Sequence, residues 1–239
     1  MSERIRTEPG TRRVRGMLAG QYLVDSTAPL LVWEIPYYPT YYFPIADVKM
    51  DHLEVTDEVK RSPSRGQATL YDLVVGDTRR PQGAYIHPEP KVPELADHVA
   101  FSWAALDHWF EEDEEVFVHA RDPYTRVDIL RSSRTVRVEL DGVEVARSSG
   151  ASFLFETGHP VRYYLPKTDV RLDLFTESDR VTHCPYKGSA RYWTAHIDGQ
   201  EHPDILWGYD YPVPESDRIA GLVSFYSEKV DIFVDDQPV

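Results

Sequence analysis

The stretch WEIPYYPTYYFPIADV, residues 33–48, returns in altered form as FETGHPVRYYLPKTDV, residues 155–170, at an offset of 122 positions. Both copies have glutamate as the second residue, two adjacent tyrosines, a proline two residues later and a final aspartate–valine pair. The same offset also aligns Ser26 with Ser148, Arg65 with Lys187, Ala68 with Ala190 and Tyr85 with Trp207. An ungapped register of this length predicts two tandem copies of one domain.

The repeat divides the 239 residues into four segments. We expect a flexible N-terminal tail at 1–11, a first repeat domain at 12–120, a packed connector at 121–131 and a second repeat domain at 132–239. Each copy has the size of a common small domain.

The connector does not resemble a flexible linker. Residues 121–131 contain no glycine or serine and alternate charged with aliphatic residues. We therefore expect the connector to pack against the domains rather than to act as a tether. Its charged residues are expected to form ion pairs or hydrogen bonds between the domains; they are Arg121, Asp122, Arg126 and Asp128.

Hydrophobic periodicity indicates that each copy is rich in β-strand. Val136, Val138 and Leu140 alternate with charged residues, as in a strand with one buried face. Asp141-Gly142 then predicts a hairpin turn, because glycine reaches positive φ without steric cost. Near the end of each copy, apolar residues at helical spacing predict one short helix, over 99–110 and over 219–226.

The register between the copies is expected to slip only in this last part. Trp109-Phe110 and Phe225-Tyr226 match at an offset that is shorter by about six residues. The sequence thus predicts a longer loop in the first copy.

Composition and charge argue against several classes of protein. The formal net charge of −14 opposes binding to nucleic acid, whose phosphates such a surface would repel. No apolar run approaches the roughly 20 residues that a membrane-spanning helix requires. The arginine-rich start is not followed by an apolar stretch, so it does not resemble a secretory signal. These features predict a cytoplasmic protein whose partners are neither nucleic acids nor membranes.

The cysteine and histidine content bears on metal binding. The single cysteine, Cys184, excludes an internal disulfide and a cysteine-rich zinc site. The nine histidines show no metal-binding spacing such as His-Glu-x-x-His. We therefore expect neither a metal nor another cofactor.

Two segments of the second copy resemble a known family. FETGHPVRYYLPKTDV at 155–170 is followed by CPYKGSARYW at 184–193. Together they resemble the domain-of-unknown-function family four-two-seven, sometimes labelled nucleotidyltransferase-like, and the first copy with its connector looks like the tandem members of that family. The resemblance implies a mainly β fold, with two tandem copies of a small, tent-like, β-rich domain. It implies no particular reaction, and the sequence has no glycine-rich phosphate loop.

Differences between the copies point to candidate functional residues. SPSRG at 62–66 stands where CPYKG stands at 184–188, and Thr40 stands where Arg162 stands. Shared residues such as Asp47 and Asp169 are most simply explained by the common fold, as buried aspartates that cap a turn through backbone N–H groups. We therefore place a candidate site in the second copy. Its residues are Cys184, Lys187 and Glu156 in catalytic roles, and Arg162, Tyr164, Tyr186 and Trp193 in ligand binding.

Two functions remain open for this site. A nucleophilic cysteine needs a nearby cation or histidine to stabilise its thiolate. Lys187 or Arg162 could supply the cation, but His183 should point to the opposite face of its strand from Cys184, which could equally be a core thiol. Because no complete set of nucleophile, base and orienting residue is visible, we expect a module that binds a small, anionic molecule or a peptide. The alternative is a small-molecule enzyme that uses Cys184 or Lys187 with Glu156.

Overall fold

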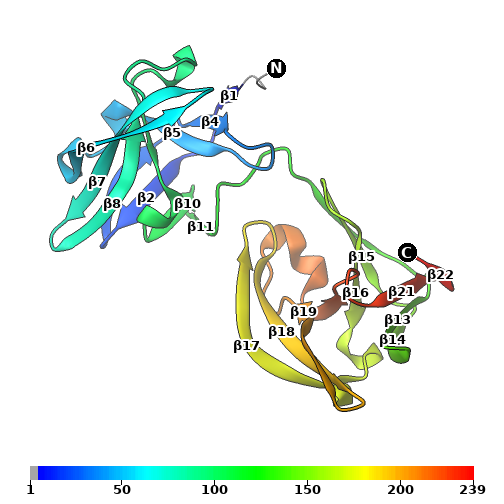
Figure 1. The fold of residues 1–239 in the computed structure, drawn as a ribbon. Helices are drawn as coiled ribbons and strands as arrows, with labels where there is room; N and C mark the ends of the chain where they lie inside the picture. Colours follow the sequence, from blue (N-terminus) through cyan, green and yellow to red (C-terminus); the bar gives the residue numbers. More distant parts are fainter. Residues whose placement is uncertain (1–4) are drawn as a thin grey trace. The chain divides into compact units, whose positions relative to one another are not determined.

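The computed structural model describes residues 5–239 and divides the chain into two compact units, Met1–Asp122 and Pro123–Val239 (Figure 1). Each unit contains a seven-stranded sheet and a four-stranded sheet of antiparallel strands. The expected mainly β fold of two tandem β-rich domains is therefore confirmed.

The first unit begins with a strand of its larger sheet. This sheet has the order β1-β4-β5-β9-β8-β7-β6. Its strands are β1 (Arg6–Pro9), β4 (Leu30–Trp33), β5 (Thr40–Pro44), β6 (Leu53–Ser62), β7 (Gly66–Val75), β8 (Thr78–Ile86) and β9 (His98–Phe101). The smaller sheet has the order β11-β10-β2-β3. Its strands are β2 (Val14–Leu18), β3 (Gln21–Ser26), β10 (His108–Glu111) and β11 (Glu114–Val116).

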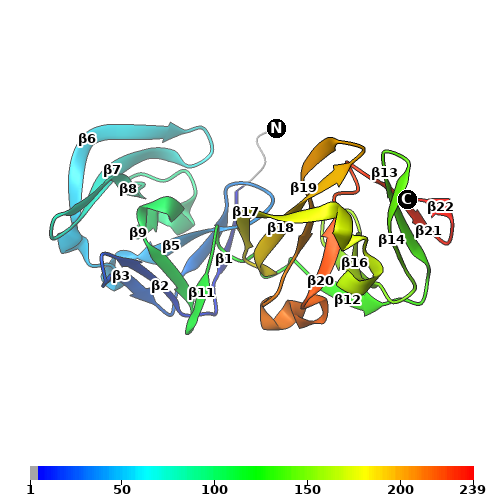
Figure 2. The same cartoon turned by 90° about the horizontal axis from the view of Figure 1, so that it is seen from below.

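The second unit repeats this arrangement, with its larger sheet in the order β12-β15-β16-β20-β19-β18-β17. The strands are β12 (Val127–Arg131), β15 (Ser152–Glu156), β16 (Arg162–Pro166), β17 (Phe175–Cys184), β18 (Gly188–Ile197), β19 (Gln200–Gly208) and β20 (Leu222–Phe225). In Figure 2 the long strands β17, β18 and β19 can be followed as one meander. The smaller sheet has the order β14-β13-β21-β22. Its strands are β13 (Val136–Leu140), β14 (Val143–Ser148), β21 (Asp231–Val234) and β22 (Gln237–Pro238).

Strand pairing corrects the expected slip between the repeats. The offset of 122 holds from β2 and β13 through β8 and β19. In the first repeat Ala84 of β8 pairs with Phe101 of β9, and in the second repeat Leu206 of β19 pairs with Phe225 of β20. Ala84 and Leu206 are 122 positions apart, but Phe101 and Phe225 are 124 positions apart, so the offset between the repeats is 124 at β9 and β20. In the smaller sheets, Trp109 pairs with Gly16 in the first repeat, and Ile232 pairs with the equivalent Val138 in the second. Trp109 and Ile232 are therefore equivalent, at an offset of 123. Trp109 therefore does not match Phe225, and the longer loop lies in the second repeat, before β20.

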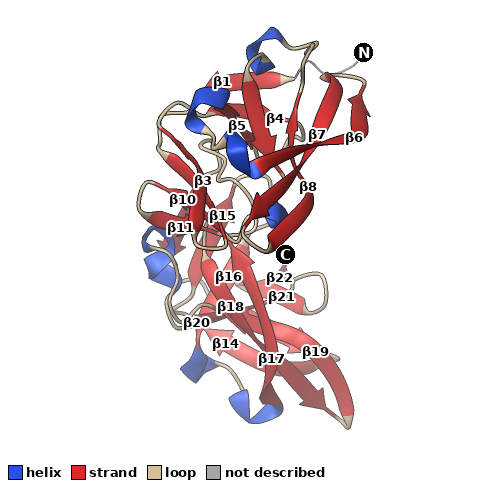
Figure 3. Cartoon of the chain, turned by 90° about the vertical axis from the view of Figure 1, so that its left-hand side faces the viewer, coloured by secondary structure: helices blue, strands red, loops and turns tan. Residues whose placement is uncertain are grey.

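The short helix expected in each repeat is a 3-10 helix, and Figure 3 shows that all helices are short. Trp103–Ala105 forms one such helix between β9 and β10, and Pro214–Ile219 forms another before β20. The other apolar residues of the predicted helices lie largely on strands: Val99 is on β9 and Phe110 is on β10. The apolar residues of 99–110 are thus divided between two strands and the turn that joins them. Their spacing along the sequence resembles that of an amphipathic helix, although they do not form one.

The outer boundaries of the domains differ from the sequence-based ones. Residues 1–4 of the predicted flexible tail lie outside the described residues, and Arg6–Pro9 form β1, which pairs with β4. The tail prediction is therefore wrong for this strand. The connector likewise ends in β12, the equivalent strand, which pairs with β15. Each repeat thus begins earlier than the sequence indicated.

The charged residues of the connector make contacts inside their own units. Trp33 donates its indole hydrogen to Asp122 at 2.8 Å, and Arg121 lies 3.8 Å from a carboxylate oxygen of Glu114. Arg126 pairs with Asp128 at 2.9 Å. The bonds between domains that we expect from these residues remain a prediction.

Each unit has its main core between the two sheets. In the second unit, Val136, Val138 and Leu140 of β13 are buried against residues of β18 to β20, such as Leu206 and Phe225. The alternation of β13 is thus confirmed, and Asp141-Gly142 forms the predicted turn with positive φ at both residues. A second, smaller cluster covers the other face of each seven-stranded sheet.

The shared aspartates do have a structural role. Ser26 donates its hydroxyl hydrogen to Asp47 at 2.6 Å, and Ser148 does the same to Asp169 at 2.5 Å. Each serine oxygen also accepts a backbone N–H two residues later, so the pair fastens the turn after β3 or β14. The partner is a serine hydroxyl rather than backbone N–H groups, but the conclusion that these residues serve the fold agrees with the contacts.

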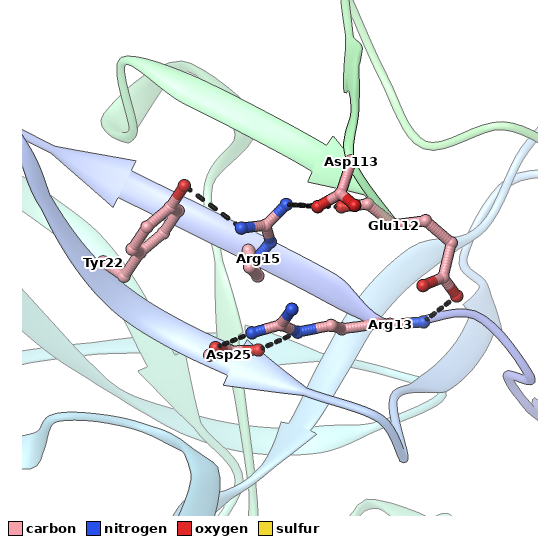
Figure 4. A network of polar contacts seen from close by, with 6 residues as sticks. All are labelled: Arg13, Arg15, Tyr22, Asp25, Glu112 and Asp113. Carbon is pink, nitrogen blue, oxygen red and sulfur yellow. Dashed lines mark hydrogen bonds and ion pairs between the residues drawn. The ribbon is translucent and has the colours of Figure 1, made fainter.

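Arg15 forms another shared structural feature, shown in Figure 4. Its guanidinium donates to the Glu112 carbonyl at 2.6 Å and to Asp113 at 2.8 Å, and it lies over the ring of Phe110. The equivalent Arg137 lies over Phe233, with 3.9 Å between the guanidinium carbon and the ring centroid. Arg13 and Arg15 thus belong to the surface of the smaller sheet.

Among residues 5–239, no helix has both the length and the apolar character that crossing a membrane requires.

Candidate functional site

The candidate site lies on the face of the second seven-stranded sheet that points away from the main core. Tyr192 pairs with Trp207, which in turn pairs with Ser224, so these residues form one row across β18, β19 and β20. The indole N–H of Trp207 donates to the Tyr164 hydroxyl at 3.3 Å. We call this surface the aromatic face; its rings are those of Tyr164, Tyr192, Trp207, Tyr209 and Tyr226.

The predicted residues Glu156 and Lys187 form an ion pair beside these rings. Their carboxylate oxygen and ammonium nitrogen are 2.5 Å apart, and the two side chains are only 10% and 12% exposed. Removing both charges from water is costly, and the pair recovers this cost only through close mutual contact. The structure therefore brings two of the three proposed catalytic residues together, with the ammonium held by a carboxylate rather than free.

The first repeat contains the same pair, which corrects the comparison of the copies. Arg65 pairs with Glu34, and this carboxylate also accepts hydrogen bonds from Tyr42 at 2.7 Å and Tyr85 at 3.2 Å. The Arg65–Glu34 pair stands where the Lys187–Glu156 pair stands. A cation at this place is therefore a property of both repeats, and it does not set the second one apart.

Burial changes the acid–base behaviour of the aromatic face. It raises the pKa of Tyr164 and the pKa of Tyr209 well above their ordinary value. Burial and a hydrogen bond with Tyr192 raise the pKa of Tyr226 to about 12. These phenols stay protonated at neutral pH, so they act as hydrogen-bond donors and apolar surface and not as bases.

Arg162 lies on the same face, since it pairs on the strand with Leu154 of the aromatic cluster. Its guanidinium carbon is 5.6 Å from the centroid of Trp207. The guanidinium binds Glu228 through two hydrogen bonds of 2.7 and 3.0 Å and donates to Ser227 at 2.8 Å. Arg162 is thus oriented as an anion receptor, with a carboxylate of the same chain already bound to it.

Cys184 is half-buried at the end of β17, where it pairs with Gly188. Its electrostatic influence reaches Tyr164 and Tyr209, whose phenols are not bases at neutral pH. The adjacent His183 directs Nδ1 to the hydroxyl of Ser189, 2.8 Å away. Thr182, two residues before Cys184, contacts the Tyr192 hydroxyl at 2.8 Å, which assigns this side of β17 to the aromatic face. Cys184 lies two residues further along the same strand, so its thiol is expected on this face as well.

One of the predicted residues, Trp193, stands apart from this group. Trp193 packs against the main core, because its neighbour Tyr192 faces the other way, and Lys167 lies 4.9 Å from its ring centroid. Trp193 is therefore not part of the aromatic face. Tyr186 belongs to the loop between β17 and β18, and its backbone carbonyl accepts a hydrogen bond from Ser216 at 2.9 Å.

Several residues of the aromatic face were missed by the sequence reasoning. The guanidinium carbon of Arg180 lies 4.6 Å from the centroid of Tyr192, and the Tyr226 ring lies 4.3 Å from that of Trp207. The ammonium of Lys229 is 5.2 Å from the Tyr226 ring. Ser224 is fully buried, and within residues 5–239 its hydroxyl has no hydrogen-bond partner.

A position-by-position comparison of the repeats could have identified some of these residues. At five positions the second repeat has a larger or more polar residue than the first. The pairs, aligned by strand position, are Thr40 and Arg162, Glu58 and Arg180, Leu70 and Tyr192, Ala100 and Ser224, and Ser102 and Tyr226. The counterparts of Arg180 and Tyr192 follow from the constant offset of 122, whereas those of Ser224 and Tyr226 require the offset of 124 that only the strand pairing shows.

Comparisons with known proteins agree with this two-fold organisation. No curated protein matches the chain. The model of one family matches twice, over residues 6–112 and 128–236, and these ranges start with β1 and within β12. The two matches together cover most of the chain, which therefore belongs to the family described as domain of unknown function DUF427 and contains two copies of its domain.

Proposed function

We propose that the second repeat is a binding domain for a small anionic molecule, which it holds on the aromatic face beside Arg162. The observation that carries this proposal is the set of residues found only in the second repeat. Arg162 lies on β16, Ser224 on β20, Tyr192 on β18 and Arg180 on the edge strand β17 of one sheet, and Tyr226 directly follows β20.

The asymmetry argues against a purely structural role for this set. The first repeat folds with Thr40, Leu70 and Ala100 at these positions, so neither the arginine nor the larger ring is required by the fold. Arginine over aromatic rings is a common means of binding carboxylates and phosphates. Arg162 and Arg180 each pair with a carboxylate of the chain, so an anionic ligand would bind by taking the place of such a carboxylate.

Ser224 supports the same conclusion. Leaving a buried hydroxyl without a hydrogen bond costs about 1–3 kcal/mol, and the alanine of the first repeat avoids this cost. Ser224 lies in the row between Trp207 and Tyr164, under the proposed ligand. A polar group of the ligand, or a water molecule that comes with it, would satisfy this hydroxyl.

Binding fits these residues better than catalysis does. An amine nucleophile must lose its proton, whereas Lys187 is held against the Glu156 carboxylate at 2.5 Å. The Glu156 carboxylate is the partner of Lys187, which disfavours its use as a base toward Cys184. These residues thus supply recognition groups and a paired charge.

The test is a screen of small carboxylates and phosphates by thermal shift, followed by calorimetric titration of each compound that stabilises the protein. Arg162→Thr installs the residue of the first repeat and should abolish the shift. The matched control is Arg171→Gln, which removes another arginine paired with a neighbouring carboxylate, Asp173, outside the aromatic face. Equal loss in both variants, or no stabilising anion for the wild type, would contradict the proposal.

A further inference from the structure

Glu228 binds Arg162 in the way that a free carboxylate ligand would. Its two oxygens accept one hydrogen bond each from the two terminal nitrogens of the guanidinium, at 2.7 and 3.0 Å. Such two-pronged pairing is the preferred geometry between arginine and a carboxylate. Glu228 is carried by the segment between β20 and β21, and its side chain is 55% exposed.

The Glu228 carboxylate is charged throughout the physiological range. The hydrogen bonds from Arg162 lower its pKa to about 2, assisted by its own backbone N–H and by Ser227. Yet the Glu228 side chain is largely exposed, and an ion pair at the surface contributes little net stability, because water solvates the carboxylate when it separates from its partner. The contact is therefore well formed and at the same time easy to replace by another carboxylate.

We propose that Glu228 occupies the carboxylate subsite of the aromatic face, and that the ligand is a planar aromatic carboxylate which displaces Glu228 from Arg162 and lays its ring against Tyr226. This inference rests on the proposed function and specifies its ligand class. The exchange is one carboxylate for another, so the charge around Arg162 does not change. A doubly charged phosphate would instead add a negative charge beside Arg162 that the exchange of carboxylates does not add.

The rings around Arg162 supply the aromatic part of the argument. The guanidinium lies over Trp207, and the Trp207 ring contacts that of Tyr226 at 4.3 Å. Tyr226 is half-buried, it lies two residues before Glu228, and its ring also has the ammonium of Lys229 at 5.2 Å. An aromatic acid whose carboxylate binds Arg162 can therefore bury its own ring against Tyr226, a contact that acetate cannot make. Tyr226 has serine as its first-repeat counterpart, Ser102.

The experiment is a calorimetric titration of the full chain with sodium benzoate, compared with acetate and phenyl phosphate at constant ionic strength. Benzoate should bind more tightly than either. Glu228→Gln should raise the affinity for benzoate about two- to fivefold, the range that removal of a competing exposed ion pair accounts for. Glu201→Gln removes an exposed glutamate elsewhere on the second unit and should leave the affinity unchanged.

Further variants separate the failure of this inference from that of the proposed function. Tyr226→Ser should reduce the affinity for benzoate to that for acetate. Tighter binding of phenyl phosphate with retained dependence on Arg162 would overturn the ligand class and leave the proposed function standing. An unchanged benzoate affinity in Glu228→Gln would overturn the displacement. Binding of no anion by the wild type would overturn both. The amide dispersion in a proton NMR spectrum verifies that each variant is folded.

Discussion

Arg65 and Lys187 occupy the same position in the two repeats, and each pairs with the glutamate that precedes it by 31 residues. The cation has changed between the copies while the carboxylate has not. Both pairs lie on the face of the seven-stranded sheet opposite the main core, next to a buried tyrosine, Tyr42 or Tyr164. The pair is therefore a fixed part of the domain, around which the surrounding residues differ.

The first prediction concerns the strength of this pair. Lys187→Met should lower the free energy of unfolding by about 3 kcal/mol, because it leaves the Glu156 carboxylate buried without its partner. Lys187→Arg should have a much smaller effect, since the first repeat holds a guanidinium at this place. Urea unfolding monitored by tryptophan fluorescence measures both. If the two variants lose the same free energy, the cost arises from packing and not from charge.

The organisation of the fold was largely predictable from the repeat. A constant offset over 26–85 specified that two equal domains exist, and the alternation at Val136–Leu140 specified a half-buried strand. The ends of the domains were less accessible to this reasoning. β1 and β12 share no identical residues at the offset of 122, and they are recognised as strands only through their pairing with β4 and β15.

A second prediction follows from β12 and the domain boundary. The fragment 123–239 should fold, whereas the fragment 132–239 should be less stable by at least about 2 kcal/mol. The shorter fragment lacks Ile129, which is buried in the aromatic cluster, and burying such a side chain contributes about 1.5–3 kcal/mol. It also lacks the Ile129 carbonyl that accepts a hydrogen bond from Arg218 at 3.0 Å. Thermal unfolding of the two fragments tests this, and equal midpoints would contradict it.

A third prediction concerns the pH dependence of the first repeat. His87 is only 3% exposed, and burial together with the charge of Arg65 lowers its pKa below 6.5, although a hydrogen bond with the Gln67 carbonyl opposes this shift. As the pH falls through about 6.5, His87 therefore binds a proton in the unfolded chain but not yet in the folded chain. The stabilisation is fully present above this pH and is lost as the pH falls below it.

The variant His87→Tyr, which installs the residue of the second repeat, should remove this part of the pH dependence. Urea unfolding at about pH 7.5 and about pH 5.5 measures this dependence, because the two pH values lie on either side of the pKa of His87 in the unfolded chain. His98→Gln serves as the control for loss of a histidine elsewhere in the same unit. If the free energy of unfolding changes by the same amount between the two pH values in the wild type and in His87→Tyr, a group other than His87 causes the pH dependence.

The candidate site was predicted in part. Glu156, Lys187, Arg162 and Tyr164 lie where the motif placed them, on one face of the sheet. Trp193 was assigned to the same site because motif residues are close in sequence, but adjacent residues of a strand point to opposite faces. Glu228 could not be predicted, because its contact with Arg162 joins positions 66 residues apart through a loop.

The last prediction concerns Cys184, the residue on which an enzymatic function would most depend. Cys184→Ser should change the free energy of unfolding by about 1 kcal/mol or less, because the first repeat has a serine, Ser62, at the equivalent position. The same variant should leave the affinity for benzoate unchanged, since the proposed contacts are those of Arg162 and Tyr226.

Thiol labelling tests whether Cys184 is accessible in the folded protein. Cys184 is half-buried at the end of an edge strand, so iodoacetamide should label it in the folded protein, but more slowly than in urea. Lys187→Arg keeps the neighbouring charge and is the control for an effect of the cation on this rate. If Cys184→Ser abolished ligand binding while the protein remained folded, Cys184 would be part of the site, and a covalent role for its thiol would replace simple binding as the function to test.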